Sequence, residues 1–305
     1  MANKHASLDA LFTDIADAIR EKTGDKGVIP AVDFPDMIRE KLQVIPPPAY
    51  LTFSSPNNFT LKVNDVTKHW NGTLEYSTDT STWTTWDGTT TLSSATSGSD
   101  NVLYMRGTGN TVITGSRPNY KWVLTGTDIA CIGNIENLLD YATVKSGAHP
   151  TMADDCYSYM FNGCTSLTQA PALPATTLAD YCYSYMFGGC HSLTQAPALP
   201  ATTLADRCYY QMFHGCTSLT QAPALPATTL NSYCYNNMFS GCTKIKLSST
   251  KTGEYTVAYC IPFKGTGTTA PSALFNMFAS TGGTFTGTPK INTTYYLSNS
   301  NTIVG

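Results

Sequence analysis

The sequence predicts a multidomain fold: a small N-terminal helical module, an all-β sandwich, and then an α/β solenoid built from 26-residue units. The strongest observation is a repeat, because the block SLTQAPALPATTL begins at Ser166, Ser192 and Ser218. Self-similarity at a fixed period of this length is the signature of stacked structural units. Short β-branched and aromatic segments before the repeat predict the sandwich, and apolar residues at helical spacing predict the first module.

Residues 1–45 are expected to form the helical module. Their apolar residues recur at helical spacing, and a second short helix is expected near residues 35–42. A segment of this length buries little surface alone, so we expect it to attach to another protein or to self-associate. Residues 46–48 are three prolines, which predict a stiff linker.

Residues 49–127 are expected to form the β-sandwich. They contain runs such as AYLTFSS and YKWVLTG, separated by turn residues, and several short strands at regular spacing favour that fold. The segment STDTSTW at residues 77–83 resembles the Asp-box of sialidases and related β-propellers, with Ser81 in place of glycine. In those families the motif stabilises a β-hairpin, so a structural role is expected here.

Residues 128–290 are expected to form the solenoid, with atypical units at its two ends. The first of these is TDIACIGNIENLLDY, and the segment SALFNMFASTGG is similar to the repeats and predicts a decayed final unit. Terminal units differ from the others because one of their sides faces water. Residues 291–305 are expected to end the chain in a strand.

Each repeat is predicted to contain a short helix and an extended segment. In the second repeat, Cys182, Met186 and Cys190 are spaced at i, i+4 and i+8, which predicts a two-turn helix with a buried stripe. Asp180 is a suitable N-cap for this helix, and Gly189 is a suitable residue to end it. The proline-rich segment after it is expected to be extended, with its leucines pointing inward.

Comparison of the repeats within the chain separates constant positions from changing ones. The changing positions fall at i, i+3, i+4 and i+7 of the predicted helix, on the face opposite the buried stripe. Tyrosine with small polar residues is typical of adaptable recognition surfaces. Exposed positions also drift without any function, and the variation alone is compatible with that alternative. The predicted ligand- or receptor-binding residues are Tyr159, Tyr181, Tyr185, Arg207, Tyr210, Gln211, His214, Tyr233, Asn236 and Asn237.

The sequence predicts no catalytic residue, no cofactor and no metal, and therefore a protein that is not an enzyme. Most of the ten cysteines form two series on the inward stripe, which indicates ladders of buried thiols, although stacked coils can bring cysteines within disulfide range. Neither a CxxC pair nor a cysteine–histidine group with ligand spacing is present. The five histidines are scattered, and nothing proposes a pair of facing carboxylates.

Charge and hydropathy exclude two classes of partner. The net charge is -3 and there is no Lys/Arg cluster, so nucleic acid is not an expected partner. No apolar run reaches the length of a membrane span, and the N-terminal residues place charges inside their apolar pattern. Neither a membrane span nor a secretory signal peptide is therefore expected.

The repeat MFxGCTSLTxAPALPATTLAxxCY resembles the BspA-like leucine-rich repeats found in proteins of gut bacteria and their phages. The match is close over residues 150–247 and specific because it recurs in register. It implies a leucine-rich-repeat-like solenoid used for attachment to surfaces or host factors, and it carries over no catalytic residues. The N-terminal segment LFTDIADAIREKTG…FPDMI resembles the helical module at the start of many phage tail and tail-fibre proteins.

Together the two resemblances imply a phage tail protein, located in the virion, that presents its repeats to a host cell-surface receptor, either glycan or protein. Residues 1–45 would contact other tail proteins, and a homotrimer is expected by analogy with tail fibres. Two alternatives remain open at this point. One is a bacterial surface adhesin with the same repeats, and the other is a purely structural virion component that binds no receptor.

Overall fold

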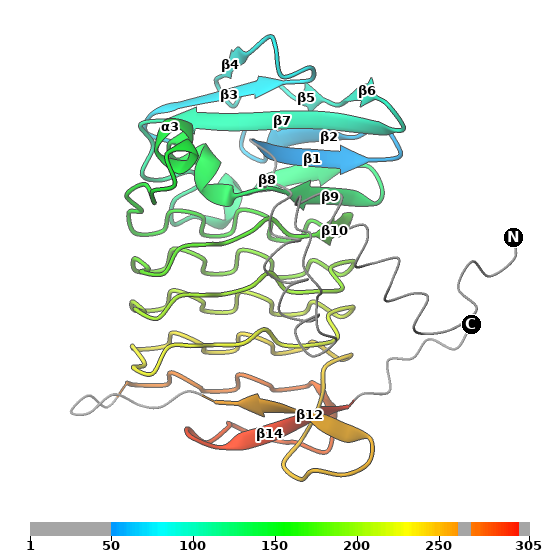
Figure 1. The fold of residues 1–305 in the computed structure, drawn as a ribbon, viewed down its shortest axis with the longest axis vertical. Helices are drawn as coiled ribbons and strands as arrows, with labels where there is room; N and C mark the ends of the chain where they lie inside the picture. The colour runs from blue at the N-terminus through cyan, green and yellow to red at the C-terminus, as the bar shows by residue number, and fades with distance from the viewer. Residues whose placement is uncertain (1–49, 262–269, 299–305) are drawn as a thin grey trace, which may run out of the picture. The chain divides into compact units, whose positions relative to one another are not determined.

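The computed structural model describes residues 50–261 and 270–298 (Figure 1). The chain separates into two units, residues 1–47 and 48–305, and all described residues belong to the second unit. The predicted helical module, the proline linker and the end of the predicted C-terminal strand lie outside the described residues. The described part of the chain is β-rich, with several open sheets and few helices.

Two sheets share a core in the first part of the described chain. Their strands are β1 (Leu51–Ser55), β2 (Thr60–Val63), β3 (Thr73–Ser77), β4 (Thr84–Trp86), β5 (Leu92–Ser93), β6 (Ala95–Ser97), β7 (Asp100–Thr108), β8 (Trp122–Thr125), β9 (Ile129–Ile132) and β10 (Leu167–Gln169). One sheet has the order β10-β9-β1-β7-β3-β4, with β6 paired to β7, and the other has the order β5-β2-β8. The rings of Phe53 and Trp122 lie 6.4 Å apart, so apolar side chains of the two sheets pack together.

The turn between β3 and β4 confirms the hairpin that the Asp-box-like segment predicts. The two strands pair antiparallel, with Tyr76 opposite Thr84. The Asp79 carboxylate accepts hydrogen bonds from the backbone N–H groups of Ser81 and Thr82, at 2.9 and 2.8 Å. These bonds lower the pKa of Asp79 to about 2. The side chain therefore acts as a turn-stabilising acceptor.

The larger sheet runs without a break into the repeats. Strand β9 pairs antiparallel with β1 on one side and parallel with β10, from the first repeat, on the other. The short helices η3 (Ile135–Leu138) and α3 (Tyr141–Lys145) follow β9, while η2 (Pro118–Tyr120) precedes β8. None of the helices among the described residues has the length and apolar character needed to cross a membrane.

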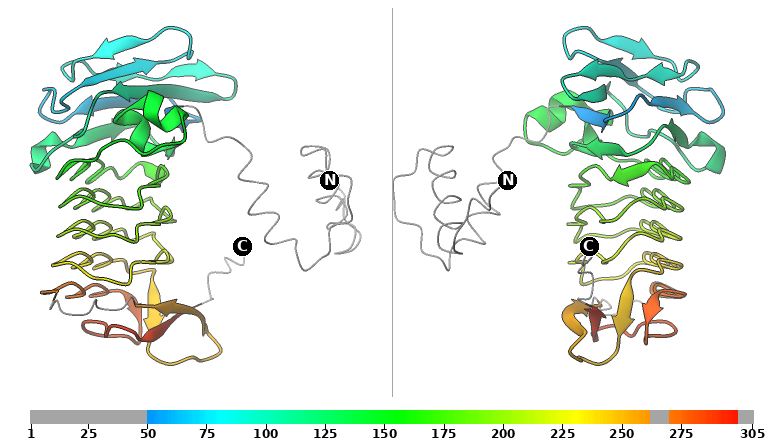
Figure 2. Two further views of the ribbon diagram at one scale, coloured as in Figure 1. Left: turned by 60° about the vertical axis from the view of Figure 1, so that its left-hand side comes forward. Right: turned by 90° about the vertical axis from the view of Figure 1, so that its right-hand side faces the viewer.

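The repeats lie one above another and are joined by backbone hydrogen bonds (Figures 1 and 2). The N–H of Tyr157 donates to the carbonyl of Cys182 at 2.8 Å, and Tyr183 and Tyr209 make the equivalent bonds to Cys208 and Cys234. The final unit continues the series, because Tyr235 donates to Ala273 at 3.0 Å. The segment SALFNMFASTGG therefore supplies one more coil of the stack.

The predicted two-turn helix in each repeat is wrong, because these residues form a chain of turns. In the first repeat, the N–H groups of Tyr157, Tyr159 and Phe161 all donate to the next coil. The intervening residues donate within the coil, for example Met160 to the carbonyl of Tyr157 at 3.1 Å. An α-helix would use every one of these N–H groups internally, in bonds to the residue four positions earlier. Half of them instead connect neighbouring repeats.

A positive φ angle at every fourth residue produces this chain of turns. In the first repeat the three such residues are Asp155, Tyr159 and Gly163, with φ of 56, 60 and 78°. Gly189, which was predicted to end the second helix, is the third residue of the same series in its repeat, with φ of 73°. The predicted burial of Cys182 and its partners at i+4 and i+8 is confirmed, since the turn period of four preserves that spacing.

The proline-rich segment forms a strand, β10, in the first repeat, where β9 is available as a partner. In the second repeat the same segment forms no strand. A single parallel bridge between Thr177 and Thr203 joins the first two repeats just after this segment. The predicted inward leucines of that repeat, Leu193, Leu199 and Leu204, are all buried.

Two aromatic ladders fill the interior of the stack. Phe161, Phe187, Phe213, Phe239 and Phe278 lie at successive ring distances of 5.7, 5.6, 5.6 and 5.3 Å, nearly parallel. A second ladder contains Tyr157, Tyr183, Tyr209 and Tyr235. Phe161 also contacts Phe53 and Trp122 of the two sheets, so the core of the sheets and the core of the stack are continuous.

The cysteines are unpaired, and nine of the ten are buried. The thiol of Cys190 donates to the carbonyl of Phe161 at 3.1 Å, and Cys216 and Cys242 make the equivalent bond at 3.0 Å. Burial raises the pKa of these thiols, to about 12 for Cys216. They therefore act as small, weakly hydrogen-bonding core residues.

A four-stranded sheet covers the far end of the stack. It contains β11 (Lys246–Ser248), β12 (Tyr255–Cys260), β13 (Gly282–Gly283) and β14 (Thr294–Ser298), in the order β12-β14-β11-β13. Tyr259 of β12 places its ring at 90° to Phe278, 5.7 Å away, and so covers the last phenylalanine of the ladder. The predicted C-terminal strand is present as β14, as far as Ser298.

Candidate functional site

Five of the residues predicted to bind a ligand line one groove on the side of the stack. The lining residues are Ser116, Asp155, Ser158, Tyr159, Tyr181, Ser184, Tyr185, Arg207 and Tyr210, and we call this site the tyrosine groove. Its volume is about 440 Å³, within the range of small-ligand sites. Sequence reasoning placed its tyrosines and Arg207 on one face through a helix that does not form.

The other predicted binding residues lie outside the lining. His214 is exposed, Gln211 and Asn237 are partly exposed, and Tyr233 packs beside Arg207. Asn236 is buried, with 3% of its surface exposed, and its amide donates to the carbonyl of Ser272 at 3.2 Å. The prediction that Asn236 lies on a binding face is therefore wrong, because this position points into the stack.

Two outward columns form the walls of the groove. The residues with positive φ project outward from each turn, and stacking aligns them into one column from Asp155 to Tyr181 and Arg207 and a second from Tyr159 to Tyr185. Both columns therefore arise from a local backbone angle and the coil-to-coil hydrogen bonds.

The floor of the groove lies between the columns. Ser158 and Ser184 are buried there, and each hydroxyl points to a carbonyl of the next coil at 3.4 Å. The next residue in this inward-pointing column is Tyr210, which is partly exposed because its ring does not fit the space of a serine. Tyr210 therefore closes one end of the groove.

The tyrosine hydroxyls converge at that end. The rings of Tyr159 and Tyr185 stack at 4.5 Å with an interplanar angle of 10°, and Tyr210 meets Tyr185 edge-on at 5.4 Å. Burial, together with the neighbouring Tyr210 and Tyr159 phenols, raises the pKa of Tyr185 above its ordinary value. A phenol is protonated at neutral pH even at its ordinary pKa, so the Tyr185 hydroxyl is a hydrogen-bond donor.

Arg207 is held in place by two tyrosine rings. Its Nη1 donates to the hydroxyl of Tyr181 at 2.7 Å. Its guanidinium carbon lies 5.2 Å from the ring centre of Tyr181 and 4.5 Å from that of Tyr233. No carboxylate within the described ranges forms an ion pair with Arg207. The guanidinium is therefore oriented by aromatic contacts and not by a counter-ion.

Asp155 lies at the opposite end of the groove. Burial is the main cause of its raised pKa, and the neighbouring carboxylates of Asp154 and Asp180 add to it. The groove is thus dipolar, with an acidic end on the first repeat and a guanidinium on the third. Asp155 occupies the same changing position of the repeat as Tyr181 and Arg207. Nothing in the sequence pointed to Ser116, which lies in the segment between β7 and η2, before the repeats.

No family model, curated protein or solved structure matches this chain. The leucine-rich-repeat and phage tail resemblances therefore stay predictions that rest on the repeat and on the N-terminal segment.

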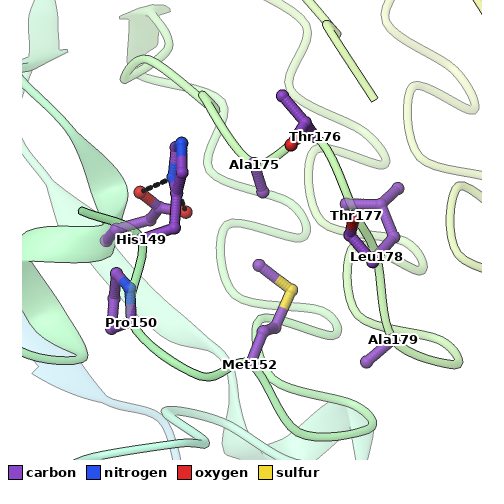
Figure 3. Close-up of a pocket in the computed structure, with 9 residues that line it drawn as sticks. His149, Pro150, Met152, Ala175, Thr176, Thr177, Leu178 and Ala179 are labelled. Carbon is purple, nitrogen blue, oxygen red and sulfur yellow. Dashed lines mark hydrogen bonds and ion pairs between the residues drawn. The ribbon is translucent and has the colours of Figure 1, made fainter. Parts of the chain in front are cut away.

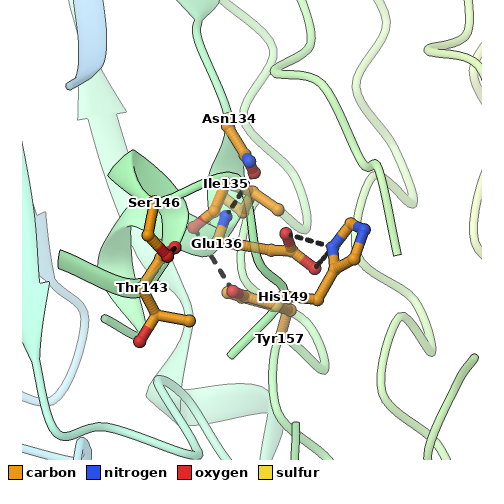
Figure 4. A network of polar contacts seen from close by, with 7 residues as sticks. All are labelled: Asn134, Ile135, Glu136, Thr143, Ser146, His149 and Tyr157. Carbon is orange, nitrogen blue, oxygen red and sulfur yellow. Dashed lines mark hydrogen bonds and ion pairs between the residues drawn. The ribbon is translucent and has the colours of Figure 1, made fainter. Parts of the chain in front are cut away.

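A second cavity, of about 280 Å³, lies where the segment after α3 covers the first repeat (Figure 3). Its polar feature is Glu136, whose side chain has 2% of its surface exposed. The Glu136 carboxylate accepts hydrogen bonds from Nδ1 of His149 at 2.8 and 3.1 Å (Figure 4). The opposite wall is formed mainly by Met152 and residues 175–179.

This second cavity fits a structural role better than a chemical one. A carboxylate that orients a histidine is two-thirds of a catalytic triad, but no hydroxyl among the described residues is hydrogen-bonded to the His149 ring. The described residues also contain no group of His, Cys, Asp and Glu that could hold a metal ion. The pair instead attaches His149 to the buried Glu136, next to the ring of Tyr157, whose hydroxyl donates to the carbonyl of Ile135.

Proposed function

We propose that this chain is a non-enzymatic binding protein whose tyrosine groove contacts a ligand on a cell surface. The observation that carries the proposal is the set of large side chains at positive φ along the groove. Tyr159, Tyr181, Tyr185 and Arg207 have φ between 55 and 60°. A bulky residue in this region costs about 1 kcal/mol, whereas glycine or asparagine is accommodated more readily.

The final coil provides an internal comparison. At the same turn positions it has Ser272, Asn276 and Ser280, with φ of 52, 52 and 56°, whereas Gln211 and Tyr233, beside the groove residues Tyr210 and Arg207, are large at φ of 53 and 56°. If exposed positions of the stack simply drifted, small residues of this kind would be expected throughout. Strained backbone positions tend to be kept where function requires the side chain. The tyrosines and Arg207 therefore favour recognition over drift.

The proposal includes the finer architecture and the biological setting. The 26-residue motif, the ladder of coil-to-coil hydrogen bonds and the continuous aromatic interior support a leucine-rich-repeat-like solenoid. The two resemblances support a phage tail protein in the virion, with residues 1–45 contacting other tail proteins and a trimer by analogy. A bacterial adhesin and a receptor-independent virion component are the competing assignments.

Residues that the chain itself uses in equivalent positions provide the test. We would change Tyr185 to Asn and Tyr210 to Ser, since Asn237 and Ser184 occupy the same positions in other repeats. The matched control is His191→Thr. His191 is exposed and lies outside the groove lining, and threonine occupies the same repeat position at Thr217. We expect the double variant to lower adsorption to host cells at least about tenfold, because tyrosines at a binding centre each contribute 1 kcal/mol or more.

The melting temperature distinguishes binding from folding. Loss of the Tyr185 ring contacts costs about 1 kcal/mol and relief of its strained φ returns a similar amount. Removal of the partly exposed Tyr210 ring costs about 1 kcal/mol more, so the double variant should melt within about 2–4 °C of the parent. Equal adsorption of the double variant and the His191→Thr control would contradict the proposal. Normal adsorption together with defective particle assembly would instead support a purely structural virion component.

A further inference from the structure

The basic end of the groove presents hydrogen-bond donors to whatever enters it. Tyr181 accepts a bond from Arg207, which leaves its own hydroxyl proton to donate outward and strengthens that donation. The hydroxyls of Tyr185 and Tyr210 lie close to each other at this end of the groove. A guanidinium has five N–H donors in a planar fork, and only one of those of Arg207 is used by Tyr181.

The charge at this end lacks a counter-ion within the described part of the chain. Asp155 belongs to the same column, but two coils away, or roughly 10 Å at about 4.8 Å per coil. A partly buried guanidinium with unused donors, fixed between two rings, is pre-organised for a planar or tetrahedral anion.

We infer that the tyrosine groove binds an acidic saccharide, with the carboxylate or phosphate of the sugar on Arg207 and its hydroxyls on the tyrosine phenols. This inference rests on the proposed function and names the ligand class for the same site. The sequence left glycan and protein receptors open.

The lining favours a saccharide over a peptide. Peptides that bind as amphipathic helices or proline-rich segments place apolar side chains in hydrophobic or aromatic grooves. Val66, Val257, Phe275 and Ile291 are the exposed large apolar residues of the described chain, and none of them lines the groove. The accessible hydroxyls of its tyrosines and of Ser116 line it instead, and they match a ligand that carries many hydroxyls of its own.

The test measures binding of matched small probes to the full chain by ligand-observed NMR or calorimetry. The probes are methyl β-glucuronide, glucose 6-phosphate and the neutral methyl β-glucoside. We expect at least one acidic probe to bind about tenfold more tightly than the glucoside, the size of one charge-assisted hydrogen bond. The carboxylate and phosphate arms show which acid the site prefers.

Two variants with opposite expectations localise the anion. Arg207→Gln should abolish the preference for the acidic probe, and Arg207→Lys should keep part of it, because lysine keeps the charge but not the fork. Asp155→Asn should leave the preference equal or larger, because it removes a negative charge from the other end of the groove. Each variant is used only if its melting temperature equals that of the parent, so that a change in binding does not reflect unfolding.

Three results would overturn the inference. These are equal binding of neutral and acidic probes, an unchanged preference in Arg207→Gln, and binding of a tetraglutamate peptide in place of either acidic sugar. Failure of the proposed function is a separate result, since it appears as normal cell adsorption by the Tyr185 and Tyr210 variant. Lost adsorption with no acidic preference would keep the binding function and reject only the acidic saccharide.

Discussion

Replacement of Tyr183 by phenylalanine should stabilise the protein. Tyr183 is the second member of the interior tyrosine ladder, and its hydroxyl is buried with no hydrogen-bond partner among the described residues. A buried polar group without a partner costs about 1–3 kcal/mol, whereas the packing contacts of one oxygen are worth only about 0.5 kcal/mol. We therefore expect Tyr183→Phe to raise the free energy of unfolding by about 1 kcal/mol.

Tyr157→Phe is the matched control, because it makes the same change in the same ladder with the opposite sign. The Tyr157 hydroxyl donates to the carbonyl of Ile135 at 3.3 Å, so its removal should cost about 0.5–1 kcal/mol. Urea titration gives both free energies. The corresponding shifts in melting temperature are about 2 °C per kcal/mol, upward for Tyr183→Phe and downward for Tyr157→Phe.

The pH dependence provides a second readout. Burial raises the pKa of Tyr183 well above its ordinary value, while in the unfolded chain the phenol ionises near pH 10. The free energy of unfolding of the parent is therefore unaffected by Tyr183 ionisation below about pH 10 and falls as the pH rises further, because only the unfolded state releases the proton. Phenylalanine has no such loss, so the advantage of Tyr183→Phe should grow above pH 10.

The reasoning would be refuted if Tyr183→Phe lowered stability by 1 kcal/mol or more, or if its advantage did not grow with pH. The first result would mean that the hydroxyl has a strong partner, such as a bound water molecule, in the folded protein. The second would mean that the phenol ionises as readily in the folded protein as in the unfolded chain.

Two further predictions concern the interior of the stack. A thiol reagent such as DTNB should react quickly with one cysteine of the native protein, Cys260, and with all ten after denaturation. The other nine thiols are buried and have raised pKa values, which slows their reaction. Fast reaction of several thiols without denaturant would contradict the burial of the cysteines. Phe213→Ala should lower the free energy of unfolding by about 3–5 kcal/mol, since the ring is fully buried between Phe187 and Phe239. Phe275→Ala, at a ring that is 49% exposed, should cost little, and equal losses in the two variants would show that the ladder does not carry the stability.

Part of the candidate site could be predicted from the repeats alone. Position-by-position comparison placed Tyr159, Tyr185 and Arg207 on one outward face, because inside and outside positions differ in composition whatever the local backbone is. It failed at Asn236, which shares its position with Tyr210. The two residues differ in size, and only the space between the columns decides that asparagine points inward while tyrosine remains partly exposed.

The sequence by itself determined the period of 26 residues and the buried series of Cys and Met in the repeats. These follow from the alternation of apolar and polar side chains, which is a local property of the chain. Only the tertiary structure decided between helix and turns. Over nine residues a period of four and a period of 3.6 bury the same side chains, so the outcome depends on whether each N–H finds a carbonyl in the neighbouring coil. The tyrosine groove exists for the same reason, since its walls, its serine floor and Ser116 come together only when distant segments stack.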